Sequence, residues 1–166
     1  MVYKFSIGQD SHRFEEKDCT KKLILGGLEI EGYPGLSGNS DADVVLHALA
    51  NAISGVTCIN ILGAVSDRLC LEDGITDSRF YVLEALKYLS PGKIVHVSIS
   101  IEAQRPKFAP VIAKMREKIG ELLGISPSVI GITATSGEGL TAFGKGEGIF
   151  CTVGLTTSYP DEKSGE

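Results

Sequence analysis

The alternation of apolar and polar side chains is most regular between residues 95 and 102, where the chain reads VHVSISIE. The four apolar side chains are expected on one face of a strand, and the four polar ones, His96 among them, on the other. Within a second segment, Gly26 and Gly27 predict the tight turn of a hairpin. Runs of β-branched and aromatic residues predict strands at 2–8, 22–30, 129–135 and 147–157.

A helical period predicts a first helix in ADVVLHALANAI, residues 42–53. Ser40 and Asp43 precede it with the S-x-x-D spacing of a capping box. A helix amino terminus also attracts phosphate, so the cap and a phosphate contact remain compatible roles for this segment.

Two further helices follow. One is predicted from about Ser78 to Leu89, with Asp77 as its cap and Pro91 as its stop. The other follows Pro106 and ends at a glycine, and its apolar positions repeat on one face: Ile112, Met115, Ile119 and Leu122, with Gly124 as the stop.

The order of these elements predicts an α+β fold, in which a mixed β-sheet is covered on one face by helices and a hairpin lies at each end of the chain. The polar face of the strand at 95–102 then needs a neighbour or solvent. We expect either water or another subunit against it. At 166 residues the chain is expected to form one domain over 1–158, followed by a polar tail at 159–166.

Composition excludes several classes of protein. The net charge of −5, without a basic cluster, disfavours nucleic acid as a partner. No apolar run approaches the roughly 20 residues that cross a bilayer, and the amino-terminal residues do not resemble a targeting peptide, so a cytoplasmic protein without membrane contact is expected. The four cysteines are scattered, which predicts neither a disulfide framework nor a zinc knuckle.

The glycine-rich stretch TSGEGLTAFGKGEG, residues 135–148, partly matches two nucleotide-binding motifs. Read as a P-loop, it has Gly146 where a hydroxyl should bind magnesium. Read as a dinucleotide fingerprint, it should open a helix, but the following FGKGEG is too rich in glycine to hold one. Both interpretations are therefore disfavoured.

Candidate metal ligands occur near the amino terminus and in the first helix. Asp10 and His12 are two residues apart at the end of a strand, so their side chains point to the same side. On the helix, Asp43, His47 and Asn51 recur every four residues as a polar stripe among apolar neighbours. Two histidines and a carboxylate can form a zinc site with an open position. The alternatives are an Asx-turn at Asp10 and a structural helix histidine at His47.

The segment AQRPKF, residues 103–108, connects a strand to a helix and places Lys107 at the predicted helix start. It is either a plain connection or a clamp for an anionic ligand. His96 is interpreted as structural.

Six motifs in order, GxDxHRF, LGG, NSDADVVLHALANAI, TDSR, AQRPK and ATSGEGL…GKGEGI, span residues 8–149. Together they resemble the 2-C-methyl-D-erythritol 2,4-cyclodiphosphate synthase family. The resemblance implies a homotrimer with active sites between subunits. It also implies a reaction in which 4-diphosphocytidyl-2-C-methyl-D-erythritol 2-phosphate closes to the cyclic diphosphate and releases CMP.

The resemblance also implies roles for residues. Asp10, His12 and His47 match zinc ligands, and Glu138 matches a ligand of a magnesium or manganese ion. Asn39 and Ser136 stand at catalytic positions. The implied contacts to the cytidine-diphosphate-linked substrate are Asp10, His12, Asn39, Ser40, Ile61, Gly63, Ala103, Pro106, Lys107, Phe108, Ala109, Ala134, Thr135, Ser136, Glu138, Ala142 and Lys145.

Several positions depart from the family pattern, among them Ser136, where the family usually has a threonine and the hydroxyl is kept. Asn39 replaces a histidine and retains hydrogen bonding without a charge. Asn51 and Ile61 replace aspartates that normally contact the methylerythritol hydroxyls, and Lys145 replaces an arginine, which keeps the charge but loses the bidentate fork. These changes leave two alternatives to the cyclase: a non-catalytic metal- and nucleotide-binding trimer, or a phosphatase or cyclase for a related nucleotide diphosphate.

Overall fold

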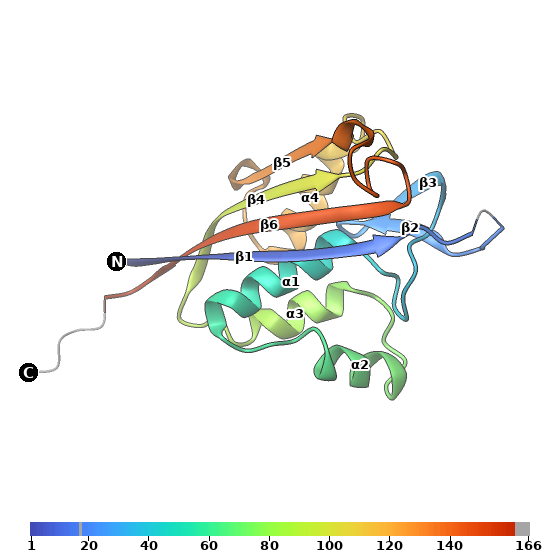
Figure 1. Ribbon diagram of the computed structural model, residues 1–166. Helices are drawn as coiled ribbons and strands as arrows, with labels where there is room; N and C mark the ends of the chain where they lie inside the picture. The colour runs from blue at the N-terminus through green and yellow to red at the C-terminus, as the bar shows by residue number, and fades with distance from the viewer. Residues whose placement is uncertain (17, 162–166) are drawn as a thin grey trace, which may run out of the picture.

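A four-stranded sheet forms the centre of the computed structural model, which describes residues 1–16 and 18–161 (Figure 1). β6 is antiparallel to both of its neighbours, whereas β4 and β5 run parallel, which confirms the predicted mixed sheet. In spatial order the strands are β1 (Val2–Arg13), β6 (Gly148–Tyr159), β4 (Lys93–Glu102) and β5 (Ile130–Thr135).

A separate hairpin consists of β2 (Lys22–Leu25) and β3 (Leu28–Pro34). Gly26 and Gly27 form its two-residue turn with φ of 60° and 75°, as a type I′ turn requires, so this prediction is confirmed. The predicted hairpin at the carboxyl end is wrong. β4 lies between β5 and β6, because β5 follows β4 by a parallel crossover through a helix rather than by a tight turn.

Three predicted helices lie on one side of the sheet and bury their apolar residues there (Figure 1). They are α1 (Val44–Thr57), α3 (Arg79–Leu86) and α4 (Ile112–Leu123). α1 packs on β1 and β6, and α4 on β5. The helix α2 (Ala64–Leu71) was not predicted, and Ser66 is its buried residue. Its apolar contacts are limited to the partly buried Val65 and Leu69, which are too few to indicate a helical period in the sequence.

The helix starts differ from the predicted ones. Asp43, not Ser40, caps α1, because its side chain accepts hydrogen bonds from the amides of Val45 and Leu46. Ser78, not Asp77, is the N-cap of α3. The prediction that Lys107 opens a helix is also wrong.

α4 begins only at Ile112, and residues 103–111 form a connection of bends and turns ahead of it. Its predicted end is confirmed, since Gly124 adopts the left-handed conformation there, with φ of 65°. α3 ends at Leu86, three residues before the predicted end.

The outer face of the sheet, opposite the helices, carries the predicted polar residues of β4: His96, Ser98 and Ser100 are exposed. On β1 this face is apolar, with Tyr3, Phe5 and Ile7 60–65% exposed. Of the predicted tail, Tyr159 ends β6 and residues 162–166 lie outside the described part of the chain. Within the described residues, no helix is long and apolar enough to cross a membrane.

Candidate metal and phosphate site

Asp10 and His12 project from β1 toward α1. They alternate with exposed neighbours along the strand, so both lie on the helix-covered side. Gly8, one step earlier on the same side, allows α1 to approach closely: a Cβ there would stand 2.1 Å from the carbonyl oxygen of Ala48. Because strand and helix approach closely here, His47, which directly precedes Ala48 in α1, reaches Asp10.

The three predicted zinc ligands converge. Asp10 Oδ2 lies 2.9 Å from His12 Nε2 and 2.9 Å from His47 Nδ1, and the two ring nitrogens are 3.1 Å apart. The Asp10 side chain is 25% exposed, that of His12 20% and that of His47 10%, so the triangle is partly shielded from water. Ligands of a tetrahedral ion with bonds of 2.0–2.1 Å stand about 3.3 Å apart. The donor set and its spacing therefore fit a metal ion of this kind.

Charge within the triangle is strongly perturbed. Burial acts to raise the pKa of Asp10, but hydrogen bonds from His12 and His47 outweigh burial and hold that pKa far below its usual range. Burial acts to lower the pKa of His12, but its hydrogen bond with Asp10 raises it above the ordinary value. The ionised carboxylate thus favours a positive charge beside it, and a metal cation bound there would supply one.

Each histidine has a second partner on its far side. His12 Nδ1 lies 2.8 Å from the carbonyl oxygen of Ser37, and His47 Nε2 lies 2.9 Å from the hydroxyl of Ser78. Sequence reasoning assigned Ser78 no role of its own, although the motif TDSR, residues 76–79, contained it. Ser78 was predicted as the first residue of the helix, with Asp77 as its cap.

The glycine-rich loop after β5 forms a second cluster. Ser136 donates a hydrogen bond to the carboxylate of Glu138 at 3.0 Å, and Glu138 itself has a positive φ of 50°. Thr141 donates to Glu102, the last residue of β4, and so fastens the loop to the strand end. The loop exposes both Ser136 and Glu138.

The segment 103–109 lies directly beside this loop. The amide of Ala103 donates to Thr135 O at 3.0 Å, and that of Gln104 to Phe143 O at 3.0 Å. Ala103, Pro106 and Phe108 are buried, while Lys107 and Ala109 face solvent. The structure thus brings the predicted nucleotide-contacting segments together, with a lysine and a hydroxyl-bearing loop on the surface.

Comparison with known proteins agrees with this geometry. Residues 3–157 match the sequence profile of the YgbB family. The chain belongs to the YgbB family. A relative from Chlamydia muridarum, the 2-C-methyl-D-erythritol 2,4-cyclodiphosphate synthase, is 53% identical over 156 residues, which are 93% of this chain and 88% of that protein.

Solved structures give the same fold. The bifunctional IspDF from Campylobacter jejuni superposes with a TM-score of 0.86 at 26% identity, covering 96% of this chain and 43% of that longer one. IspF of Plasmodium falciparum, in a complex with CDP, superposes with a TM-score of 0.77 at 25% identity, covering 93% of this chain and 95% of that one. The α+β fold predicted for this YgbB-family chain is confirmed.

Glu138 does not join the metal triangle within one chain. The paired residues Thr135, Glu102, Phe150 and Ser11 cross the sheet from β5 to β1. Three strand spacings of about 4.8 Å place the loop end of β5 about 14 Å from the metal-bearing strand of this YgbB-family chain. Among the described residues, the cluster of three or more histidine, cysteine or carboxylate side chains with metal-ligand spacing is Asp10, His12 and His47, and Glu138 is not part of it.

The remaining predicted residues lie around α1. Ser40 is buried with its hydroxyl 3.4 Å from His47 Nε2, while Asn39 is exposed in the same loop. Ile61 is 1% exposed and belongs to the hydrophobic core, whereas Gly63 is exposed just before α2. Asn51 donates to the carbonyl of Gln9 at 3.0 Å, so this member of the predicted polar stripe ties α1 to β1.

Asp43 also leaves the predicted stripe, because its carboxylate turns away from His47 to the amides of Gly26 and Gly27.

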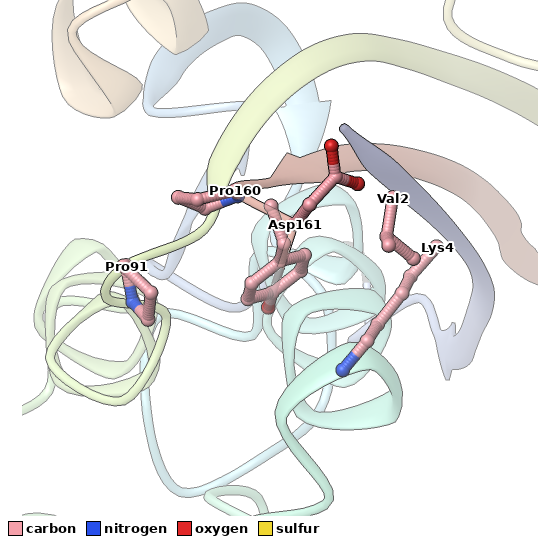
Figure 2. A pocket seen from close by; sticks show the side chains of 6 residues that line it. Val2, Lys4, Pro91, Pro160 and Asp161 are labelled. Atoms are coloured by element: carbon pink, nitrogen blue, oxygen red, sulfur yellow. The ribbon is translucent and has the colours of Figure 1, made fainter. Parts of the chain in front are cut away.

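A pocket of about 780 Å³ opens at the other end of the sheet, among Val2, Lys4, Pro91, Pro160 and Asp161 (Figure 2). Val2 precedes Asp10 by eight residues on β1, so the pocket lies about 27 Å from the metal triangle. The carboxylate of Asp161 is paired with the amino terminus, and the Lys4 amine stands 4.5 Å from the centre of the Tyr159 ring. In the YgbB-family chain this pocket is therefore remote from both clusters.

Proposed function

We propose that this protein is a 2-C-methyl-D-erythritol 2,4-cyclodiphosphate synthase that converts 4-diphosphocytidyl-2-C-methyl-D-erythritol 2-phosphate to the cyclic diphosphate and CMP, in non-mevalonate isoprenoid biosynthesis. The observation that carries the proposal is the convergence of Asp10, His12 and His47 into a triangle with metal-ligand spacing. The name of the Chlamydia muridarum relative, at 53% identity, supports the same activity.

The reaction transfers a phosphoryl group within one molecule. An oxygen of the 2-phosphate forms a bond to the β-phosphorus, and the bond from that phosphorus to the bridging oxygen of CMP breaks, with CMP leaving as the product. No side chain needs to become covalently attached. The protein has to hold the chain of the substrate in a ring-closing conformation and offset the charge of its phosphates.

A zinc ion on Asp10, His12 and His47 would polarise phosphate oxygens as a Lewis acid, and a magnesium or manganese ion would be held by Glu138. Ser40, whose hydroxyl lies beside His47, and Asn39, the residue before it, are proposed to donate hydrogen bonds to phosphate oxygens. The amide of Asn39 can donate but not carry a proton away, so Asn39 serves to orient phosphate rather than as an acid.

The nucleotide is proposed to bind at the other cluster. Lys107 offers a positive charge to phosphate, and the backbone of 103–109 together with Ala134, Thr135, Ser136 and Ala142 forms the surface for cytidine. The Plasmodium falciparum neighbour was solved in a complex with CDP, which supports a cytidine nucleotide as ligand. Ser136 is assigned to the transferring phosphate, and the Glu138 beside it to the second metal.

Both clusters must reach one substrate, and we propose that a second copy of the chain supplies one of them. Within a chain they are about 14 Å apart on different strands, across the width of the sheet. The exposed Tyr3, Phe5 and Ile7 on the outer face supply apolar surface for such contact. A homotrimer, with Lys145 near its axis, is the assembly we propose.

The methylerythritol end is proposed to bind near α2, through exposed backbone groups around Gly63, whose own position is held by the buried hydroxyl of Ser66. The Asn51 side chain donates its hydrogen bond to β1, and Ile61 is buried. Neither residue can therefore take over the contact with the methylerythritol hydroxyls that the family's aspartates make.

The test is to incubate purified protein with zinc, magnesium and the cytidyl substrate and to follow phosphorus NMR. We expect equal amounts of CMP and the cyclic diphosphate. Linear phosphate products would instead show a phosphatase. Metal-dependent CMP binding without any product would show a non-catalytic binding protein, and either result would refute the cyclase.

A further inference from the structure

His47 belongs to a directed chain of hydrogen bonds that runs away from the metal triangle. Its Nε2 lies 2.9 Å from Ser78 Oγ, and Ser78 Oγ in turn donates to Asp41 Oδ1. Ser78 is fully buried, so water does not replace either bond. The chain joins the residue that lies in the metal triangle to a carboxylate two residues before the cap of α1.

The carboxylate at the end of this chain is itself fixed. Asp41 Oδ2 accepts from the amide of Ser78 at 3.1 Å, and Asp41 Oδ1 accepts from the amide of Asp43 at 3.1 Å. With the hydroxyl of Ser78, three donors hold one acidic side chain. Ionised carboxylates accept stronger hydrogen bonds than neutral acceptors do, so the hydroxyl proton of Ser78 points to Asp41.

This direction determines the tautomer of His47. A hydroxyl has one proton, and once Ser78 donates it to Asp41, its oxygen is left to accept from His47 Nε2. Without a metal, Nδ1 shares a proton with Asp10. A zinc ion would displace that proton, and the proton of the neutral imidazole then sits on Nε2 while the Nδ1 lone pair is free for the ion. Nδ1 is the nitrogen that faces Asp10 and His12, at 2.9 and 3.1 Å.

We propose that Ser78 and Asp41 are positioning residues for metal binding, which hold His47 in the tautomer and ring orientation that present the Nδ1 lone pair to the ion. The Asp41 carboxylate also stabilises positive charge at Nε2, which makes the Nδ1 lone pair a stronger ligand for the metal. The other histidine uses a backbone carbonyl, that of Ser37, for the same purpose. Of the two supports, the one behind His47 is therefore the side-chain support that substitution can remove.

The neighbouring hydroxyl of Ser40 is not equivalent. It lies 3.4 Å from His47 Nε2, near the limit for a hydrogen bond, and it already accepts from the amide of Ala42 at 3.1 Å. The relay therefore runs through Ser78.

The inference rests on the metal site of the proposed function, and zinc affinity tests it without substrate. Competition with a chromophoric chelator would give the zinc dissociation constant of the wild type and of Ser78→Ala and Asp41→Asn. Loss of such an outer partner is expected to weaken zinc binding by about 10- to 100-fold. Ser54→Ala is the matched control. Ser54, in α1, is buried as Ser78 is but lies away from the triangle, so the zinc affinity of this variant should match that of the wild type.

Two further measurements separate positioning from a general loss of structure. In EDTA, the Tm should be lowered by a similar amount in Ser78→Ala and Ser54→Ala. The rise in Tm on adding zinc should become smaller only in Ser78→Ala. Nitrogen-15 NMR of the imidazoles in the zinc-loaded wild type should show a protonated Nε2 and a metal-bound Nδ1 at His47.

A zinc affinity of Ser78→Ala within twofold of the wild type, or zinc on Nε2 of His47, would overturn the relay. If the wild type turns over substrate and both variants bind zinc as tightly as the wild type does, the relay would be overturned while the cyclase would stand. A wild type that binds zinc through the relay but forms no product would refute only the cyclase.

Discussion

Gly8 lies against Ala48 so closely that a Cβ on Gly8 would stand 2.1 Å from the Ala48 carbonyl oxygen and 2.3 Å from the Ala52 amide. Backbone atoms of a helix cannot move aside as a flexible side chain can. The absence of a side chain at Gly8 therefore sets the distance between β1 and α1, and with it the distance between Asp10 and His47.

Gly8→Ala is therefore expected to push α1 away from β1. We expect the free energy of unfolding to fall by about 3 kcal/mol, because overpacking against backbone has no cheap relief. Zinc content after dialysis should fall as well, since His47 moves with the helix. Gly131→Ala in β5, where a Cβ meets only Val97 O at 3.9 Å, is the control. Equal zinc content in the two variants would contradict this role of Gly8.

Asp43 ties the start of α1 to the turn of the β2–β3 hairpin. Its fully buried carboxylate accepts from Gly26 and Gly27 at 2.9 and 2.7 Å, and from the first turn of α1. Asp43→Asn would turn an NH₂ group toward one of these amides and leave a donor unpaired. We expect a loss of about 2–4 kcal/mol in the free energy of unfolding, measured by urea denaturation.

Burial raises the pKa of Asp43 to about 6, so this measurement belongs at pH 8, where the carboxylate is ionised. Asp67→Asn, at an exposed position of α2, is the control and should change stability little. A loss for Asp43→Asn no larger than for Asp67→Asn would mean that the hairpin contact contributes nothing.

The glycine-rich loop allows a matched pair of substitutions. Gly137 and Gly139 have nearly equal φ, 70° and 71°, so alanine strains the backbone equally at both. A Cβ on Gly137 would stand 2.3 Å from the Glu102 carboxylate, which also accepts from Thr141, whereas a Cβ on Gly139 meets nothing within 4 Å.

We expect Gly137→Ala to displace Ser136 and Glu138 and to lower kcat/KM about tenfold further than Gly139→Ala does, because positioning of the phosphates is lost. Zinc content should stay at the wild-type level in both variants, since the triangle lies on another strand. Equal activity of the two variants would show that the contact with Glu102 does not position the loop.

Mixed trimers test whether one substrate uses two copies of the chain. His47→Ala and Glu138→Gln are each expected to be inactive alone. Trimers are then reassembled from equal amounts of the two variants. A site is intact when its metal triangle comes from a Glu138→Gln chain and its glycine-rich loop from a His47→Ala chain. Random mixing in a cyclic trimer then restores about a quarter of wild-type activity. No recovery, despite mixed trimers seen by native mass spectrometry, would place both clusters in one chain.

The metal triangle predicts opposite pH responses with and without zinc. The pKa of Asp10 is lowered on folding, so its contribution to stability is present above the unfolded pKa of about 3.9 and is lost as pH falls. The pKa of His12 is raised, so its contribution is full below about 6.5 and is lost as pH rises through the folded pKa. In EDTA the triangle therefore contributes most between about pH 4 and 6.5.

With zinc, stabilisation should instead grow from pH 6 to 8, because protons compete with the metal for His12 and His47. Thermal unfolding across this range, with EDTA or zinc, measures both trends, and His12→Ala should remove both. An unchanged zinc-induced shift in Tm between pH 6 and 8 would contradict the ligand assignment.

Local sequence determined much of this protein. Alternation in 95–102 identified β4, two glycines identified the β2–β3 turn, and a left-handed stop at Gly124 ended α4, because each signal depends on backbone preferences over a few residues. The i, i+2 spacing of Asp10 and His12 and the resemblance of six motifs identified the metal ligands. Side-chain chemistry and periodicity are sufficient for such features.

Tertiary structure decided what depends on residues far apart in sequence. No local pattern indicated that β4 lies between β5 and β6. Nor did one indicate that Asp43 binds the hairpin rather than joining His47, or that Ser78 lies behind His47, 31 residues away. α2 was missed because Val65 and Leu69 alone, partly buried against the core, make too short an apolar pattern. Each of these follows from packing, in which a partner is chosen by which surfaces meet, and a linear pattern does not record that choice.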